Sequence, residues 1–219
     1  MSINLLVRRS YVALCVIVCG CGGDAASKLV AELGDSEAPV RRTAVRALAE
    51  RSIADDRVVA ALTKCVADSD AEVRYFSIEA LGKTGSDAKS SLGALKLALQ
   101  DAEPRVRLAA ALAMARIDPQ DRSFMPTLVS SMREGDGGTL REVGSLGPSA
   151  VWAVPTLCEL VSHPLPQVRV LAEHDLGRIG PEASSALPAL QAAMQDSNPA
   201  VKRAAEEASK QIHRQKPGG

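Results

Sequence analysis

A short pattern returns at a fixed interval along this 219-residue chain, and that period constrains the fold more than any other feature. Aspartate, four further residues, then valine and a basic residue recur in four nearly intact copies, which begin at Asp35, Asp68, Asp101 and Asp196. The first three aspartates are spaced 33 residues apart. Weaker copies lie around Leu140 and Arg141 and after His163, so about six units are predicted between residues 26 and 214.

Each unit is predicted to form two helices. After Val106, small or apolar residues recur at Ala110, Ala113 and Met114, which is the 3.6-residue period of an amphipathic helix. The preceding stretch of each unit has the same period. The chain is rich in alanine and has five aromatic residues in all, whereas β-sandwiches and barrels draw heavily on aromatic and β-branched residues. We therefore expect an all-α fold.

Two units end in Leu-Gly-x-x-Gly, with glycines at Gly82 and Gly85 and at Gly177 and Gly180. Together with the Asp-x-x-Pro-x-Val-Arg pattern, this ending resembles HEAT repeats, specifically the short type found in phycobilisome lyases. The resemblance covers nearly all of residues 27–214. It implies a right-handed α-solenoid of about six HEAT-like helix pairs, followed by a disordered tail at residues 215–219.

The resemblance also assigns a role to the repeated charged residues. In the HEAT family, this aspartate and arginine form a ladder between adjacent repeats, so they are structural and not catalytic. The ladder residues implied here are Asp35, Arg41, Asp68, Arg74, Asp101, Arg107, Arg169 and Asp196.

The fourth unit departs from the pattern. A glycine-rich segment, residues 134–138, replaces the usual turn, and two residues are missing between Leu140 and Leu146. Gly144 interrupts the second helix at a cost of about 1 kcal/mol relative to alanine. We expect the solenoid to bend or loosen here, either as a hinge or as a degenerate repeat.

The first twenty residues have the features of an export signal. Arg8 and Arg9 precede an uncharged apolar run that is far shorter than the roughly 20 residues needed to cross a bilayer. The run ends in Val-Cys-Gly-Cys, which resembles a bacterial lipobox with Cys21 as the lipidated residue and residues 21–26 as a tether. Cys19 is the alternative acceptor. A buried N-terminal helix of a cytoplasmic adaptor, with residues 1–20 retained, is the alternative for the whole segment.

The net charge and the predicted cellular location of the chain limit the kinds of partner that it can bind. The chain is neutral, and removal of residues 1–20 takes away two arginines and no acid, so no electrostatic attraction to nucleic acid is expected. We expect a lipid-anchored protein of the bacterial cell envelope, on the periplasmic side of a membrane, whose partner is another protein.

Little in the sequence points to catalysis. The chain has three histidines, and Glu173 with His174 is a single, reversed copy of the His-Glu pairs that hold iron in metal-dependent HEAT enzymes. We predict no catalytic residue, no metal and no cofactor. The alternative is an enzyme or cofactor-attachment factor that resembles the phycobilin lyases.

The exposed side of the second helices is the predicted binding surface. Counting from the repeated valine, the positions that point away from the core are apolar in the middle units and polar in the end units. The candidate residues are Tyr75, Phe76, Leu108, Leu112, Val170, Leu171 and His174. The alternative interpretation is that these side chains pack between neighbouring repeats.

The lipobox predicts the outcome of a labelling experiment. Cells that express the wild-type chain with labelled palmitate should yield a labelled protein in the membrane fraction, and Cys21→Ala should abolish the label because the acceptor sulfur is lost. Labelling at neither Cys19 nor Cys21 would show that the chain carries no lipid.

Overall fold

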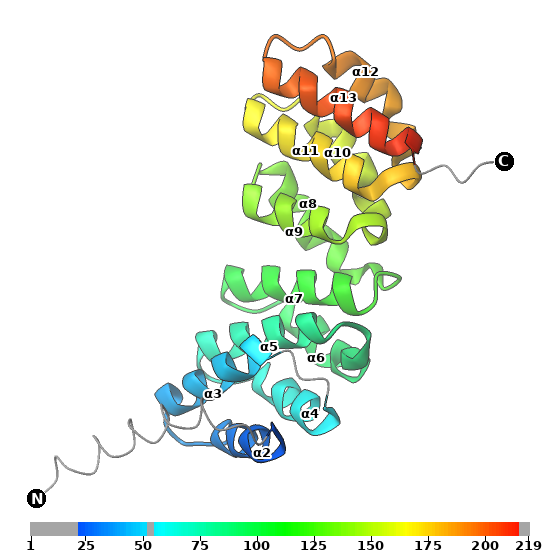
Figure 1. Cartoon of the computed structure of the whole chain (residues 1–219). Helices are drawn as coiled ribbons and strands as arrows, with labels where there is room; N and C mark the ends of the chain where they lie inside the picture. The colour runs from blue at the N-terminus through cyan, green and yellow to red at the C-terminus, as the bar shows by residue number, and fades with distance from the viewer. Residues whose placement is uncertain (1–21, 52–54, 215–219) are drawn as a thin grey trace, which may run out of the picture.

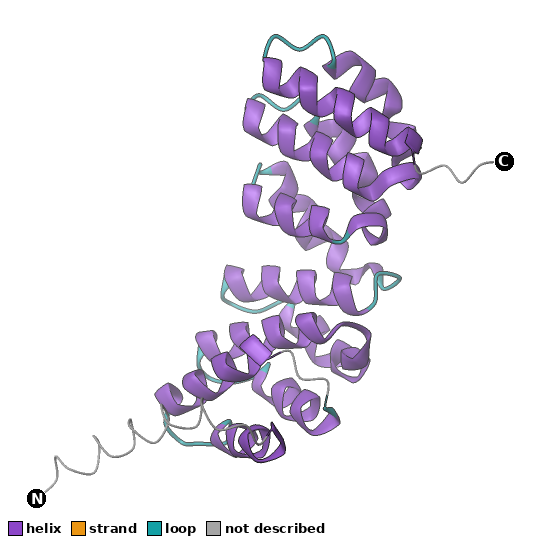
Figure 2. Cartoon of the chain, viewed as in Figure 1, coloured by secondary structure: helices purple, strands orange, loops and turns teal. Residues whose placement is uncertain are grey.

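The protein is a curved row of stacked helix pairs (Figure 1). The computed structural model describes residues 22–51 and 55–214, and every regular element within these ranges is a helix (Figure 2). The predicted signal peptide, the lipidation site Cys21 and the tail at residues 215–219 lie outside the described residues. The predicted all-α solenoid of about six helix pairs is confirmed.

Each unit contains a first helix and a second helix. The first helices are α2 (Gly22–Glu32), α4 (Asp56–Cys65), α6 (Leu92–Ala98), α8 (Met125–Arg133), α10 (Val154–Leu160) and α12 (Leu187–Ala193). The second helices are α3 (Ala38–Arg51), α5 (Ala71–Thr84), α7 (Pro104–Ile117), α9 (Gly137–Ser145), α11 (Pro166–Ile179) and α13 (Pro199–Arg214). Four short 3₁₀ segments precede α6, α8, α10 and α12, namely η1 (Gly85–Ser91), η2 (Arg122–Phe124), η3 (Gly147–Ala153) and η4 (Gly180–Ala186).

The first helix begins earlier than the sequence pattern suggested. Residues 22–26, which we assigned to a tether, form the first part of α2. Ala26 is already buried. Helix α2 packs against α3 and α4.

Local sequence explains where the helices start and stop. The Asp70 carboxylate accepts hydrogen bonds from the backbone N–H groups of Glu72 and Val73, which caps the first turn of α5. Pro104 occupies the first turn of α7, where its missing N–H costs nothing. At the other end, Gly85 and Gly180 have φ values of 65° and 80°, a conformation that other residues rarely adopt. The repeated motifs therefore specify the turns between helices.

Neighbouring second helices approach each other closely through small residues. A Cβ atom added to Gly82 would lie 3.0 Å from the Cα of Ala113 on the next second helix, and one added to Gly177 would lie 3.1 Å from the Cα of Ala208. The first glycine of the Gly-x-x-Gly motif thus lies against an alanine of the following unit. This contact sets the spacing of the layers.

Helix α9 shows that our reading of the fourth unit was wrong in its details. Gly147 has a φ of 55°, like Gly85 and Gly180, so Gly144 and Gly147 form another Gly-x-x-Gly ending. Counted from this ending, Leu140 takes the place of the buried Ile78 and not that of the repeated valine. The shortening therefore falls at the start of α9, which spans 9 residues where α5, α7 and α11 span 14.

Gly144 is a packing residue and not an interruption. An added Cβ would lie 1.8 Å from Oδ1 of Asp175 on α11, closer than any real contact. Asp175 stands where Ala113 and Ala208 stand at the other junctions, so its carboxyl group fills the space above this glycine.

This contact predicts the effect of adding one methyl group. Gly144→Ala should lower the free energy of unfolding by roughly 1 to 3 kcal/mol, because the added methyl group would displace the buried carboxyl group of Asp175. Gly93→Ala is the matched control, because nothing lies within 4 Å of the added Cβ in helix α6. The control should be neutral or stabilising by about 0.5 to 1 kcal/mol. Urea denaturation followed by circular dichroism measures both, and equal effects would contradict the close packing at Gly144.

Candidate functional site

Arginine and aspartate side chains link successive turns of the array. Nε and Nη2 of Arg41 donate to the two carboxylate oxygens of Asp68, at 2.7 and 2.8 Å. Arg74 contacts Asp101 in the same two-bond geometry, at 2.7 and 2.9 Å, and Arg169 contacts Asp196 at 2.9 and 3.0 Å. The remaining Nη1 of each arginine donates to backbone carbonyls of its own turn. Each rung therefore ties one turn to the next.

These pairs are shielded and hydrogen-bonded on several sides. The side chains of Arg41 and Asp68 are each 11% exposed. The hydrogen bonds from Arg74 lower the pKa of Asp101 below its usual range. Because their donors and acceptors are engaged with each other and with backbone groups, the ladder side chains have a structural role and present no free group for chemistry.

The ladder is interrupted around the fourth unit. Arg107 donates to the backbone carbonyls of Asp101 and Ala102, and no carboxylate partner for it is present among residues 22–51 and 55–214. In the turn before α9, the Asp136 carboxylate instead accepts hydrogen bonds from the backbone N–H of Gly138 and from the hydroxyl groups of Ser131 and Thr139. Asp35, in the first turn of the array, accepts a hydrogen bond from the N–H of Glu37.

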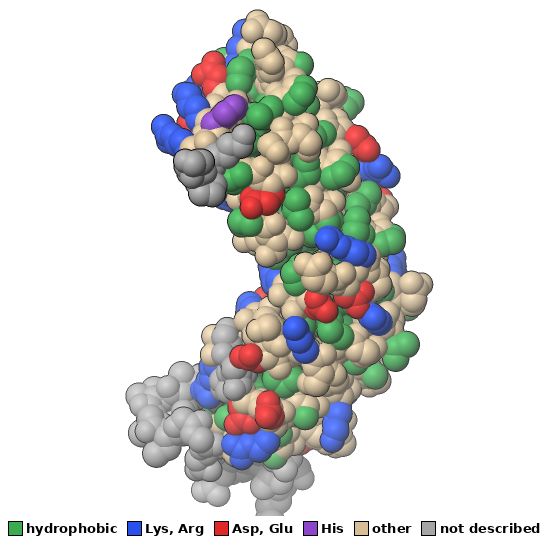
Figure 3. Space-filling model, turned by 90° about the vertical axis from the view of Figure 1, so that its right-hand side faces the viewer, with side chains coloured by type: hydrophobic (Ala, Val, Ile, Leu, Met, Phe, Trp, Pro, Cys, Tyr) green, Lys and Arg blue, Asp and Glu red, His purple; other side chains and the backbone are tan. Residues whose placement is uncertain are grey.

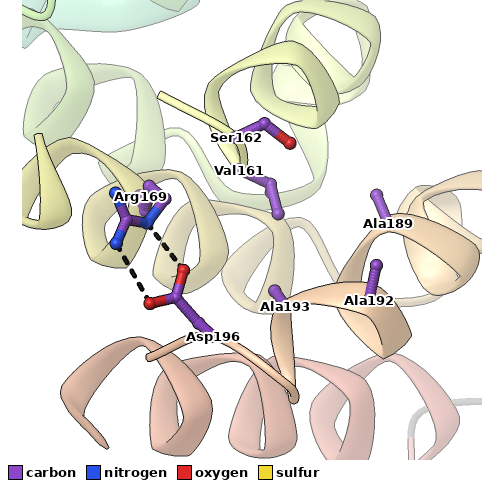
Figure 4. Close-up of a pocket in the computed structure, with 7 residues that line it drawn as sticks. All are labelled: Val161, Ser162, Arg169, Ala189, Ala192, Ala193 and Asp196. Atoms are coloured by element: carbon purple, nitrogen blue, oxygen red, sulfur yellow. Dashed lines mark hydrogen bonds and ion pairs between the residues drawn. The ribbon is translucent and has the colours of Figure 1, made fainter. Parts of the chain in front are cut away.

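A shallow depression lies beside the last rung (Figure 4). The Arg169–Asp196 pair forms one wall, and Val161, Ala189 and Ala193 face it from α10 and the region of α12 (Figure 4). Its polar lining consists of Ser162 and the Arg169–Asp196 ion pair, whose two side chains contact each other. This depression therefore offers few groups that could orient a ligand.

The second helices line the hollowed side of the array. They form the row nearest the viewer in Figure 1, and the side view of Figure 3 shows that this side is bowed inward. We call the solvent-facing surface of α3, α5, α7, α9, α11 and α13 the inner face. Of the predicted binding residues, Tyr75, Phe76, Leu108, Leu112, Val170 and Leu171 are half-buried against the core, and His174 is exposed. Each apolar side chain thus packs on one side and remains open on the other.

Two aromatic rings on the inner face are stacked with arginines. The rings of Tyr75 and Phe76 meet edge to face, with centroids 5.1 Å apart. The guanidinium carbon of Arg105 lies 3.8 Å from the centre of the Tyr75 ring, and that of Arg46 lies 4.7 Å from the centre of the Phe76 ring. Such stacking holds the guanidinium plane in place and leaves its edge donors available.

Helix α9 presents bare backbone in the middle of the inner face. Gly137 and Gly138 occupy the positions of Tyr75 and Phe76 when the units are aligned at their terminal glycines. A Cβ added to Gly137 would lie 3.4 Å from both Leu171 Cδ1 and Arg141 Nη1. The absence of side chains therefore leaves Arg141 and Leu171 beside an open stretch of helix.

Two carboxyl groups are buried in α11. Glu173 and Asp175 are 0% and 1% exposed, and both oxygens of Glu173 and one of Asp175 have no hydrogen-bond partner. Burial, together with the nearby Asp196 and against the lowering effect of Arg169, raises the pKa of Glu173 to about 8. Burial also raises the pKa of Asp175 to about 7, against the lowering effect of Arg178. At neutral pH, Glu173 is therefore mostly protonated and Asp175 is protonated in about half of the molecules.

No metal site is visible in the part of the chain that the structure describes. No three His, Cys, Asp or Glu side chains there lie close enough together to hold an ion. None of the described helices is both long and apolar enough to span a bilayer.

The sequence profile of HEAT repeats matches residues 26–95 and 151–216. The chain belongs to the HEAT-repeat family. The profile leaves out residues 96–150, which include the shortened α9. A comparison with curated proteins finds no match.

Solved structures share the fold at low sequence identity. An engineered protein is 21% identical with a TM-score of 0.60, over 88% of this chain and 97% of its own. The CpcE–CpcF complex of phycocyanin lyase from Nostoc sp. PCC7120 is 20% identical with a TM-score of 0.55, over 82% of this chain and 74% of that one. A designed armadillo repeat protein in complex with the peptide (KR)4 is 18% identical with a TM-score of 0.54, over 84% and 98%. These likenesses establish the repeat architecture.

Sequence reasoning missed the two buried acids. When HEAT units are aligned at Gly-x-x-Gly, Glu173 falls where other units have Val45, Ile78 and Ala111, and Asp175 falls where they have Ala80 and Ala113. An acid at a position that is otherwise apolar was the available signal. It was missed because Glu173 was considered only for its order with His174.

The raised pKa values predict how stability depends on pH. Between the ordinary carboxyl pKa of about 4 and the folded values of about 7 and 8, the folded HEAT array binds more protons than the unfolded chain. The free energy of unfolding should therefore fall as pH rises from about 5 to above 8, by on the order of a few kcal/mol.

The double variant Glu173→Gln with Asp175→Asn removes both titrating groups and should lose this pH dependence. Urea denaturation across the same pH range measures both proteins, and histidines and exposed acids cancel in the comparison. A wild-type stability that rises with pH, or a slope that the double variant retains, would contradict the assignment.

Proposed function

We propose that this chain is a non-catalytic HEAT-repeat scaffold that binds a segment of another protein on its inner face. The observation that carries the proposal is the open apolar row of Tyr75, Phe76, Leu108, Leu112 and Leu171 on the hollowed side of the array. Aromatic side chains with one free side are enriched in protein interfaces. His174, at the margin of this row, is exposed and adds a polar group that can donate or accept.

The mode of binding follows from the architecture. Second helices that stand side by side present the same positions at each step, so a chain laid across them meets one set of side chains per unit. The designed armadillo repeat protein crystallised with the peptide (KR)4 has this architecture and supports the proposal by analogy. The two ends of the inner face are polar, with Arg42 and Arg46 in α3 and Arg203 in α13, which places the apolar contact in the middle.

The scaffold is proposed to act outside the cytoplasm, anchored through lipid on Cys21. The support is the apolar run, the Val-Cys-Gly-Cys box and the two basic residues before it. A helical array tethered at one end keeps its inner face accessible, because the anchor precedes α2 at the start of the row.

The alternative is a cofactor-attachment factor like the phycocyanin lyase complex whose fold is similar. That function requires polar side chains gathered at one place, and the inner face of the described units is instead a mixed apolar and arginine-bearing surface. Purified protein that carries a visible chromophore or a stoichiometric metal would favour the alternative.

Binding should depend on the inner face and not on overall stability. Tyr75→Ala with Leu108→Ala should abolish capture of a partner while it lowers the melting temperature little, since both side chains are already partly open. Leu97→Ala is the matched control, because Leu97 is 80% exposed on the first helix α6. Capture from envelope extracts, quantified by mass spectrometry, is the measurement. A large loss of stability in the double variant would show that these side chains serve packing between repeats.

A further inference from the structure

Basic residues outnumber acidic residues in the second helices of units two to five. Helices α5, α7, α9 and α11 contain five acidic residues in their sequences. Three of them are paired with a basic side chain: Glu72 with Arg46, Glu79 with Lys83, and Glu142 with Arg116. The other two, Glu173 and Asp175, are buried in α11 and do not reach the surface. None of the five is therefore available to balance a further positive charge.

Several arginines of the same helices have no carboxylate partner among the described residues. Arg105 stacks on Tyr75, and Arg141 lies beside Gly137. Arg107 donates to backbone carbonyls. The sequences of these four helices thus hold eight basic and five acidic residues, although the whole chain is neutral.

Arg105 and Arg141 are the two arginines that border the open apolar row. The ring of Tyr75 fixes the plane of the Arg105 guanidinium, so its edge N–H groups are already oriented when a ligand arrives. Arg141 stands over a helix surface without side chains, with Leu171 next to it. Between them lie Leu108 and Leu112 of α7, so two donors for carboxylates flank an apolar strip.

We propose that the inner face of units two to five binds an extended acidic segment of a partner protein. Carboxylates of that segment bind Arg105 and Arg141, and its apolar side chains pack on Leu108, Leu112 and Leu171. This inference rests on the proposed binding function and adds the chemistry of the partner. It is opposite in charge to the (KR)4 peptide bound by the designed armadillo protein.

Selection from a random-peptide library on the immobilised protein tests the charge of the occupant. Aspartate and glutamate alternating with apolar residues should be enriched. The double variant Arg105→Gln with Arg141→Gln should lose that bias, whereas Arg122→Gln, which changes an exposed arginine of η2 away from the inner face, should keep it.

Fluorescence titrations then measure how tightly each peptide binds and how much each arginine contributes. Three synthetic peptides are compared, in which leucine alternates with aspartate, leucine alternates with serine, or lysine alternates with arginine. The aspartate peptide should bind tightest, each arginine substitution should weaken it on the order of tenfold, and added salt should weaken it further. The serine peptide should be insensitive to both substitutions.

The outcomes separate the two claims. Selected peptides that show no acidic bias, or a basic one, would overturn the proposed charge of the partner. If binding of those peptides still depended on Tyr75 and Leu108, the proposed binding function would stand. Peptides that bind Tyr75→Ala with Leu108→Ala as well as the wild type would overturn the binding function itself. If a single-stranded oligonucleotide bound the wild-type protein more tightly than the aspartate peptide, and its binding required Arg105 and Arg141, the surface would be assigned to nucleic acid instead.

Discussion

The close approach of each second helix to the next is the contact on which the whole array depends. It requires a glycine on one helix and a small residue opposite, as at Gly82 with Ala113 and Gly177 with Ala208. Helices this close leave no room for large side chains between them, which accounts for the many alanines and the few aromatic residues. Phe124 and Trp152 form an aromatic pair in the described core. Phe124 lies in η2 of the fourth unit, which contains the shortened α9, and Trp152 lies in η3 at the start of the fifth unit.

The fourth and fifth units combine several departures from this regular packing. Helix α9 lacks its first turn, Arg107 has no carboxylate partner in the described chain, and Asp175 replaces the alanine that should face Gly144. Burial raises the pKa of both carboxyl groups there, which links the packing of this junction to pH. Gly137 and Gly138 leave bare backbone on the inner face of the same helix, so this junction differs from the others both in the core and at the surface.

The period and the helix signals were sufficient to predict the fold and most helix ends. Asp70, Pro104 and Gly85 act through local geometry that a sequence pattern records directly. The candidate surface was predicted only in outline. Tyr75 and Phe76 could be placed by counting along a helix, but the stacking of Arg105 on Tyr75 joins positions 30 residues apart in neighbouring units. Glu173 and Asp175 were missed because burial depends on what the adjacent unit places opposite them.

The sequence by itself determined that this chain forms stacked helix pairs, because hydrophobic period, caps and terminal glycines are local properties that repeat with each unit. It also determined which residues recur at the turns. The tertiary structure decided how successive units face one another: which arginines find a carboxylate, which remain without one, and which acids lose contact with water. The physical reason is that charge pairing and burial are set by the distance between neighbouring layers, and a shift of a few residues in one helix changes them without changing the pattern of the helix itself.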